Sequence, residues 1–212
     1  MDTVALIFTL LVLILSAIIH EVMHGVAADR LGDPTARYAG RLTLNPIPHI
    51  DLYGSILLPG LLILSHSPFF FAWAKPVPYN PYNLRPGRFS EAIVAFAGPL
   101  SNLVIALLAA AFIRSNAFGE AMDLAFSTIL LVNVMLAIFN MIPIPPLDGS
   151  KVLEALLPRA LQHRYGMWRR ALERNPFIGM AIVLIFVFVL GDAYANFIYA
   201  IGSALAGPLF GA

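Results

Sequence analysis

The sequence contains no cysteine among its 212 residues. This absence excludes a disulfide framework, and it excludes metal sites built from thiolates. The ligands that remain for a transition metal are the imidazoles of five histidines and the carboxylates of 12 aspartate and glutamate residues. Any transition-metal site must therefore be assembled from imidazole and carboxylate groups.

Charged residues are also scarce. Lys, Arg, Asp and Glu make up 12% of the chain, which is about half the fraction of an average soluble domain. Hydrophobic residues make up 59%, and the mean hydropathy is +0.82. This composition indicates an integral membrane protein that lies in a lipid bilayer. The net charge is only +1, so no excess of positive charge favours nucleic acid, and we expect no nucleic-acid partner.

Basic residues are missing from the N-terminal apolar run as well. Met1–Ile19 contains neither Lys nor Arg, and it leads into His20 and Glu21 rather than into a small-residue cleavage site. Both features argue against a secretory signal peptide. We therefore predict an uncleaved first membrane helix.

Several apolar stretches approach the length of about 20 residues that a membrane-spanning helix needs. They predict an all-α polytopic membrane protein with about five to six membrane-embedded helical segments. We expect a single membrane-embedded domain over residues 1–212, with its core at about residues 4–155, C-terminal helices at about residues 176–209, and no room for a PDZ or nucleotide-sensing CBS domain. The apolar stretches are Val4–Ala28, Leu52–Ala74, Ala92–Ile113, Leu124–Leu147, Phe177–Leu190 and Ala193–Leu209.

Three segments allow more specific expectations. Arg37–Leu44 alternates like a strand, and we expect a short β-strand or hairpin there that could pair with an extended peptide. Leu52–Ala74 is long enough to cross the membrane, but its breaks at Pro59-Gly60 and Ser65–Pro68 favour a re-entrant hairpin or a tilted, kinked element. Phe177–Leu209 is either a helical hairpin or one long helix broken at Gly191-Asp192.

Basic residues are concentrated in three segments: Arg30–Arg41, Lys75–Arg88 and Lys151–Arg174. The positive-inside rule places these segments in the cytoplasm. The last of them is amphipathic, and we interpret it as a helix that faces the lipid headgroups. With this topology, the end of the first helix and the end of the helix before Asp148 reach the same, cytoplasmic side.

The motif His20-Glu21-Val22-Met23-His24 follows the first apolar run directly. Ionisable residues in such a position are a functional-site hypothesis by default. On a helix, positions i and i+4 share a face, so His20 and His24 can bind one ion. Glu21 can then reach a metal-bound water as a general base.

A catalytic zinc site needs a third protein ligand and an open position for water. The sequence favours Asp148, because it follows a proline-rich, unwound end of a membrane helix and precedes Gly149. Asn140, about two turns earlier, could donate a hydrogen bond to the substrate or the developing oxyanion, or could bind a neighbouring helix instead. The other candidates for the third ligand are Asp51, His49, His66 and Glu91.

Taken in order along the chain, these motifs resemble the site-2 protease family of intramembrane zinc metalloproteases. The resemblance rests on the His20–His24 motif and on Asn140-x-x-Pro143-x-Pro145-x-Leu147-Asp148-Gly149. Gly98-Pro99-Leu100-Ser101-Asn102 resembles the third motif of the family. Two further segments, Gly40–Pro46 and Ala72–Pro78, resemble its short prokaryotic branch without PDZ or CBS domain.

The resemblance implies one Zn²⁺ per chain, with His20, His24 and Asp148 as ligands and Glu21 as the catalytic base. It also implies hydrolysis of peptide bonds within or near transmembrane helices of membrane-protein substrates, as in regulated intramembrane proteolysis. We expect a multi-pass protein of a prokaryotic cell membrane with its active site toward the cytoplasm. The sequence leaves a homo-oligomer open.

Structural roles and non-proteolytic functions are alternatives to these expectations. Gly98 and Asn102 are as consistent with helix packing as with substrate contact. A metal-ion transporter, or a non-proteolytic metal-dependent membrane protein, would also place His and Asp in membrane helices. Such proteins rarely need Glu21, whose evident use beside a ligand histidine is proton transfer.

Overall fold

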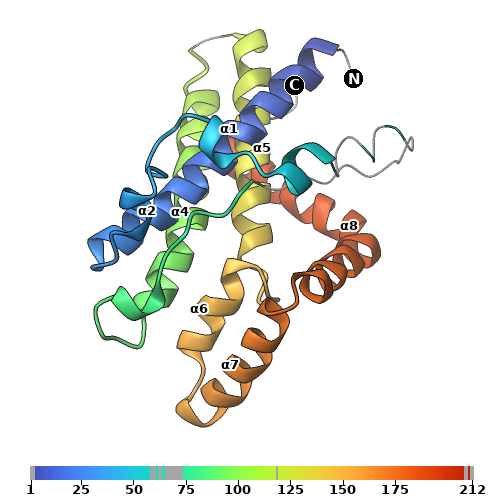
Figure 1. Cartoon of the computed structure of the whole chain (residues 1–212). Coiled ribbons are helices and arrows are strands. Elements are labelled where there is room, and N and C mark those ends of the chain that lie inside the picture. The colour runs from blue at the N-terminus through green and yellow to red at the C-terminus, as the bar shows by residue number, and fades with distance from the viewer. Residues whose placement is uncertain are drawn as a thin grey trace.

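The structure is a computed structural model, and it describes residues 3–57, 61, 64, 74–117, 119–207 and 210. Within this part of the chain every regular element is a helix (Figure 1), which confirms the all-α prediction. The long helices are α1 (Thr3–Arg30), α4 (Ser90–Ser115), α5 (Glu120–Asn140) and α8 (Pro176–Ala206). The shorter elements are α2 (Thr35–Tyr38), η1 (Ile47–His49), η2 (Leu52–Leu57), η3 (Pro81–Asn83), α6 (Asp148–Leu156) and α7 (Arg159–Glu173).

Four of the described segments are long and apolar enough to cross a membrane: α1, α4, α5 and residues Phe188–Ala206 of α8. Large apolar side chains remain exposed on the outer faces of these helices, as contact with lipid requires; examples are Leu11, Ile14, Leu107 and Val189. Most of the predicted element Leu52–Ala74 lies outside the described residues.

The helix α8 continues without a break through Gly191 and Asp192. The helical hairpin expected as one alternative for Phe177–Leu209 is therefore wrong, and so is the break at these two residues. In an apolar segment every backbone polar group must find a partner inside the chain. An unpaired backbone N–H or C=O group in the bilayer costs several kcal/mol. This cost exceeds the roughly 1 kcal/mol by which glycine disfavours a helix interior, so the helix continues.

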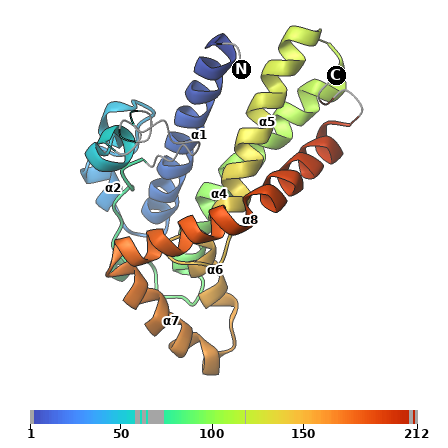
Figure 2. The ribbon, with the colours of Figure 1, turned by 90° about the vertical axis from the view of Figure 1, so that its right-hand side faces the viewer.

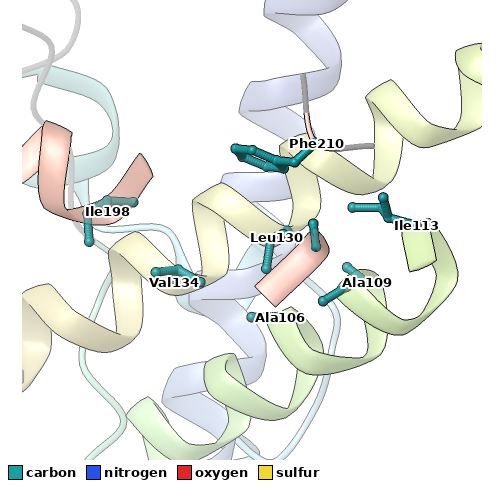
Figure 3. Packing of buried hydrophobic residues seen from close by; sticks show 9 residues of the cluster. Ala106, Ala109, Ile113, Leu130, Val134, Ile198 and Phe210 are labelled. Atoms are coloured by element: carbon teal, nitrogen blue, oxygen red, sulfur yellow. The ribbon is translucent and has the colours of Figure 1, made fainter. Parts of the chain in front are cut away.

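The helix α4 lies at the centre of the molecule and packs against α1, α5, α6 and α8. Its alanines let α5 approach closely, because small side chains allow two helix backbones to come together. Figure 3 shows the resulting core, in which side chains from α4, α5 and the C-terminal region interdigitate. Its buried members are Ala106, Ala109, Ala110, Ile113, Leu130, Val134, Ile198, Ala206 and Phe210.

The helices α6 and α7 lie at the end of the molecule opposite to both chain termini (Figures 1 and 2). Figure 2 shows α8 crossing beside α5 from the α6–α7 end toward the end that holds the termini. The chain therefore leaves α5 at the same end at which α4 begins. This arrangement brings the start of α6 next to the first turns of α4.

The expected β-strand or hairpin at residues 37–44 is wrong, because the described residues form no strand there. Asp33 starts a helical turn instead, since its side chain accepts hydrogen bonds from the backbone N–H and the hydroxyl of Thr35. Gly40, in the left-handed region at φ 65°, ends that turn, and the Arg41 N–H donates to Ala36 O. These two local signals override the alternation of side chains.

A buried arginine fixes α7 to the rest of the protein. Arg169 is only 4% exposed, and its guanidinium contacts Glu154 at 2.6 Å, Glu173 at 2.9 Å and Glu91 of α4 at 3.1 Å. Burial lowers the pKa of Arg169, but the carboxylates of Glu91, Glu173 and Glu154 outweigh burial and raise the pKa above its ordinary value. The segment Lys151–Arg174 is therefore two helices tied to α4, and its contact with lipid headgroups stays a prediction.

We expect Arg169→Ala to lower the thermal unfolding midpoint in detergent, because three carboxylates would lose their shared cation. Removing one partner of a buried ion pair typically costs about 3 kcal/mol. Arg170→Ala is the matched control, since the Arg170 side chain is 50% exposed and lies 3.6 Å from Glu154. Differential scanning calorimetry of both variants checks the prediction, and equal midpoints would contradict it.

Candidate active site

The two histidines of the first motif lie on one face of α1 near its C-terminal end. His20 is 5% exposed and His24 is 8% exposed. One potential ligand atom from each of these histidines and from Glu21 lies within 4.8 Å of the others. The helical spacing therefore brings two imidazoles and one carboxylate into a single group, as the i, i+4 pattern predicts.

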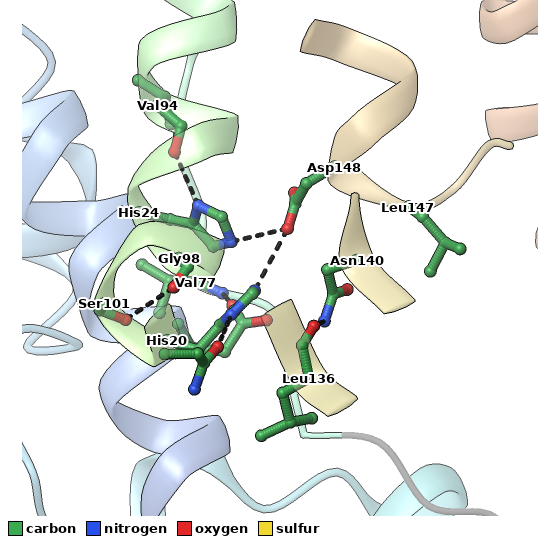
Figure 4. Close-up of polar contacts among 12 residues, drawn as sticks. His20, His24, Val77, Val94, Gly98, Ser101, Leu136, Asn140, Leu147 and Asp148 are labelled. Carbon is green, nitrogen blue, oxygen red and sulfur yellow. Dashed lines mark hydrogen bonds and ion pairs between the residues drawn. The ribbon is translucent and has the colours of Figure 1, made fainter. Parts of the chain in front are cut away.

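Asp148 reaches this group from the first turn of α6 (Figure 4). Its Oδ2 atom lies 3.2 Å from Nε2 of His20 and 3.2 Å from Nε2 of His24. The chain between α5 and α6 is irregular and rich in proline. Gly149 allows it to turn back closely, because a Cβ at this position would lie 2.1 Å from Met141 O. The structure thus brings the predicted third ligand to the two histidines.

The outer nitrogen of each imidazole is held by a carbonyl oxygen. His20 Nδ1 lies 2.6 Å from Asn102 Oδ1, and His24 Nδ1 lies 2.7 Å from Val94 O. A carbonyl oxygen only accepts hydrogen bonds, so both Nδ1 atoms carry the hydrogen. In the neutral rings both Nε2 atoms then present a lone pair toward Asp148, which is also an acceptor.

Three acceptor atoms at such short separations need positive charge between them. This charge can come from additional protons or from one metal cation. Ligands of a tetrahedral zinc ion, at bond lengths of about 2.0–2.1 Å, lie about 3.3–3.4 Å from one another. The observed separations of 3.2 Å from Asp148 Oδ2 to each Nε2 match that spacing. The residues present therefore fit a zinc ion.

Burial alone would raise the pKa of the Asp148 carboxyl. Without a metal, attraction to His24 and hydrogen bonds from His20 and His24 in their protonated forms outweigh burial and hold the pKa of Asp148 below its ordinary value, so the group is a carboxylate at neutral pH. A carboxylate with two imidazoles that release their Nε2 protons on metal binding is a suitable ligand set for a divalent cation.

Gly98 of α4 lies directly against the two imidazoles. A Cβ at this position would lie 2.6 Å from Nε2 of His20 and 2.6 Å from Nε2 of His24. The absence of a side chain at Gly98 therefore leaves room for the group. This close approach supports a packing role for Gly98, whereas contact with substrate stays a prediction.

The other two predicted site residues lie on different sides of the group. Asn102 is fully buried, and its amide contacts His20, Asn133 and Ser16. Asn140 borders a cavity beside the histidines, and its Nδ2 donates to Leu136 O of the same helix at 2.9 Å. One of the two N–H groups of Asn140 is therefore already used, and its role toward substrate stays a prediction.

A cavity of about 300 Å³ adjoins Glu21 and both histidines. The backbone N–H of Val77 donates to Glu21 Oε2 at 2.9 Å and fixes one oxygen of this carboxylate. The Val77 side chain is buried against α1, where a Cβ on Gly25 would lie 2.9 Å from Val77 Cγ1. The remaining walls come from Pro76, Tyr79, Val94, Ala95, Asn140, Pro146, Leu147, Asp148, Lys151 and Glu173.

Lys151 is a member of this cavity that the sequence motifs do not indicate. Its Nζ lies 5.2 Å from the centre of the Tyr79 ring. Burial lowers the pKa of the Lys151 ammonium, but attraction to Tyr79 and Asp148 outweighs burial and raises it overall. Lys151 therefore gives the cavity a positive charge at neutral pH, one helical turn from Asp148. The spacing of three residues from Asp148 is the signal that could have identified it.

The other candidates for the third ligand lie elsewhere. His49 is buried, and its Nε2 donates to Thr43 O within its own loop. Glu91 pairs with Arg169. Asp51 accepts from the N–H groups of Tyr53 and Gly54, and His66 lies outside the described residues.

Apolar helices of membrane-spanning length that hold two buried imidazoles and a half-buried carboxylate beside a cavity indicate a membrane-embedded protein with a candidate metal site. Comparison with known proteins narrows this class. Residues 114–186 match the family model described as Peptidase family M50. This matched region includes Asp148, whereas the motif on α1 lies before it. No solved structure is significantly similar to the chain.

Three relatives carry names that assign them provisionally as zinc metalloproteases. YwhC of Bacillus subtilis is 38% identical over 160 residues, which cover 71% of this chain and 69% of the relative. Rip2 of Mycolicibacterium smegmatis is 32% identical over 66% of this chain and 54% of its own length. MJ0611 of Methanocaldococcus jannaschii is 32% identical over 69% of this chain and 73% of its own length.

The chain belongs to peptidase family M50, the site-2 protease family. The resemblance inferred from the motifs is thereby confirmed, and the protein is site-2 protease-like and a metalloprotease by family. The family and the four apolar helices together indicate an integral membrane protein.

We expect Gly98→Ala to weaken zinc binding, because the new methyl group would occupy the space between the two Nε2 atoms. Gly191→Ala is the matched control, since a Cβ at this helical position meets nothing within 4 Å. Zinc content after dialysis, measured by mass spectrometry, checks the prediction. Equal zinc content in Gly98→Ala and the wild type would contradict it.

Proposed function

We propose that this protein is an intramembrane zinc metalloendopeptidase that hydrolyses peptide bonds within or near the transmembrane helices of other membrane proteins. His20, His24 and Asp148 hold the zinc ion, and Glu21 is the general base. The observation that carries the proposal is the convergence of the two Nε2 atoms on Asp148 Oδ2, beside a cavity that Glu21 also lines.

A bound zinc ion supplies Lewis acidity and lowers the pKa of a coordinated water to about 7. The chain supplies the remaining chemistry. Glu21 has one oxygen fixed by the Val77 N–H, so the other is available to accept the proton of the attacking water. Glu21 then passes that proton to the leaving amine. The amide of Asn140 faces the same cavity and could donate to the substrate backbone.

The location of the site agrees with a membrane-embedded substrate. Asp148 begins α6, at the end of the molecule that holds α6 and α7 (Figures 1 and 2). A transmembrane segment cleaved at this site must expose an extended stretch of backbone, because a peptide bond within a helix is shielded. The basic segments Arg30–Arg41, Lys75–Arg88 and Lys151–Arg174 support a cytoplasmic orientation for this end. Bacterial and archaeal relatives support a prokaryotic cell membrane.

The central test compares the wild type with Glu21→Gln in lipid nanodiscs. Both are given a panel of membrane-tethered substrate proteins, and zinc is quantified in each sample. We expect Glu21→Gln to keep its zinc and to lose at least about a hundredfold in cleavage rate, because general-base catalysis contributes about 10²–10⁴-fold. Glu120→Gln, an exposed acid at the opposite end of α5, is the control and should cleave normally.

Normal cleavage by Glu21→Gln would overturn the role of Glu21. Zinc transport into vesicles without any cleavage, altered by the same substitution, would favour the transporter instead. Asp148→Ala completes the test, since it should lower both zinc content and cleavage.

A second prediction concerns the contact between Val77 and Glu21. Val77 stands between Pro76 and Pro78, so it supplies the one N–H group of these three residues. Val77→Pro removes that donor, whereas Val77→Ala keeps it and shortens the side chain. We expect Val77→Pro to lower kcat about tenfold relative to Val77→Ala, because a hydrogen bond to a charged group contributes about 1.5 kcal/mol.

Steady-state cleavage kinetics of the two Val77 variants measure this difference, and KM should be similar in both. Faster cleavage by Val77→Pro would show that the contact restrains Glu21 rather than orienting it.

A further inference from the structure

A chain of side-chain amides runs from the candidate metal site into the membrane-spanning bundle. Asn133 of α5 is fully buried. Its Nδ2 donates to Ile129 O at 2.9 Å and to Ser16 Oγ at 3.0 Å, and its Oδ1 accepts from Asn102 Nδ2 at 2.9 Å. Asn102 Oδ1 then accepts from His20 Nδ1 at 2.6 Å. Three helices, α1, α4 and α5, contribute to this chain.

This series of hydrogen bonds has a direction, and a backbone carbonyl group determines it. Ile129 O can only accept, so Asn133 must turn its NH₂ group toward it and its carbonyl oxygen away. That oxygen faces Asn102, which must therefore donate its own NH₂ group and present its oxygen to His20. His20 in turn must carry its hydrogen on Nδ1. Each amide orientation follows from the one before it.

The direction matters because the amide of Asn102 could otherwise rotate by half a turn. Its NH₂ group would then face His20 Nδ1, which would have to accept. The hydrogen of the neutral ring would move to Nε2, and the ring could no longer bind a metal through that atom. His24 has no such ambiguity, because the backbone oxygen Val94 O holds its Nδ1 directly.

We propose that Asn133 is a positioning residue that, through Asn102, keeps the hydrogen of His20 on Nδ1 and leaves Nε2 free to bind the metal. This inference rests on the proposed role of His20 as a zinc ligand. Asn133 lies outside the motifs that indicate the site, and it touches none of the proposed ligands.

The competing explanation is that Asn133 only holds the helices together, since buried amides also join membrane helices. The two explanations differ in what they predict for the His20 ring. Loss of helix packing would change stability without changing the position of the ring hydrogen. Loss of positioning would change the hydrogen position in a folded protein.

The variant Asn133→Leu keeps a similarly branched but larger side chain and removes both amide groups. Ser16→Ala is the matched control, because it removes a neighbour of Asn133 but leaves the path from Ile129 O to His20 intact. Asn133→Asp tests rescue, since it keeps an oxygen acceptor facing Asn102. If Asn133→Leu does not fold, Asn133→Ala removes the same groups without adding bulk and is measured in the same way.

The first measurement is ¹⁵N nuclear magnetic resonance of zinc-free protein labelled at histidine, at a pH high enough for the His20 ring to carry a single hydrogen, with the His20 signals assigned by their loss in His20→Ala. We expect the wild type, Ser16→Ala and Asn133→Asp to show the hydrogen on Nδ1. We expect Asn133→Leu to show a mixture with the hydrogen on Nε2.

The second measurement is zinc affinity by competition with a chelator of known affinity. Groups that orient a metal ligand contribute about 10–100-fold to metal affinity. We expect Asn133→Leu to bind zinc about tenfold more weakly, near the small end of this range. The loss is small because the backbone oxygen of Ser16, 3.4 Å from Asn102 Nδ2, favours the same orientation of the Asn102 amide. Ser16→Ala should bind zinc like the wild type.

An unchanged ring hydrogen and unchanged zinc affinity in Asn133→Leu would overturn the inference. Wild-type protein that binds no zinc would instead overturn the proposed function, and the position of the ring hydrogen would still test whether Asn133 acts on His20. The two failures are therefore distinguishable.

Discussion

The structure depends on one electrostatic requirement. The Nε2 atoms of His20 and His24 each lie 3.2 Å from Oδ2 of Asp148. With neutral imidazole rings, all three atoms are acceptors. Without a cation this arrangement would repel itself, so the fold must either supply one or hold the ligands in place against repulsion. The surrounding structure holds these ligands in place. Carbonyl oxygens accept hydrogen bonds from the Nδ1 atoms of both histidines, and the first turn of α6 positions the Asp148 carboxylate.

The helix α4 holds both imidazoles of this group in place. Val94, Gly98 and Asn102 follow one another at intervals of four residues, so they lie along one face of α4. The first holds His24, the second leaves space for both rings, and the third holds His20. The face of α4 that packs against α1 is therefore also the support of the site. The same helix reaches α7 through Glu91 and Arg169.

Sequence patterns predicted the parts of the site that depend on local spacing. The pair His20 and His24 follows from helical periodicity, and Asp148 follows from the unwound, proline-rich segment before it. The hairpin at residues 37–44 was wrong because the hydrogen bonds from Thr35 to Asp33 and a left-handed glycine outweighed alternation. The contacts of Val77 and Asn133 could not be predicted, since they join residues 56 and 31 positions apart and depend on how helices pack.

The separation of the ligands along the chain has a mechanical consequence. His20 and Asp148 are 128 positions apart, so a shared metal ion would close a long loop in a protein that has no cysteine to form a disulfide. Cross-linking a loop of about 100 residues reduces the entropy of the unfolded chain by an amount equivalent to about 4.7 kcal/mol. A metal bound between α1 and α6 would thus cross-link the first and last thirds of the protein and stabilise the fold, in addition to its role in catalysis.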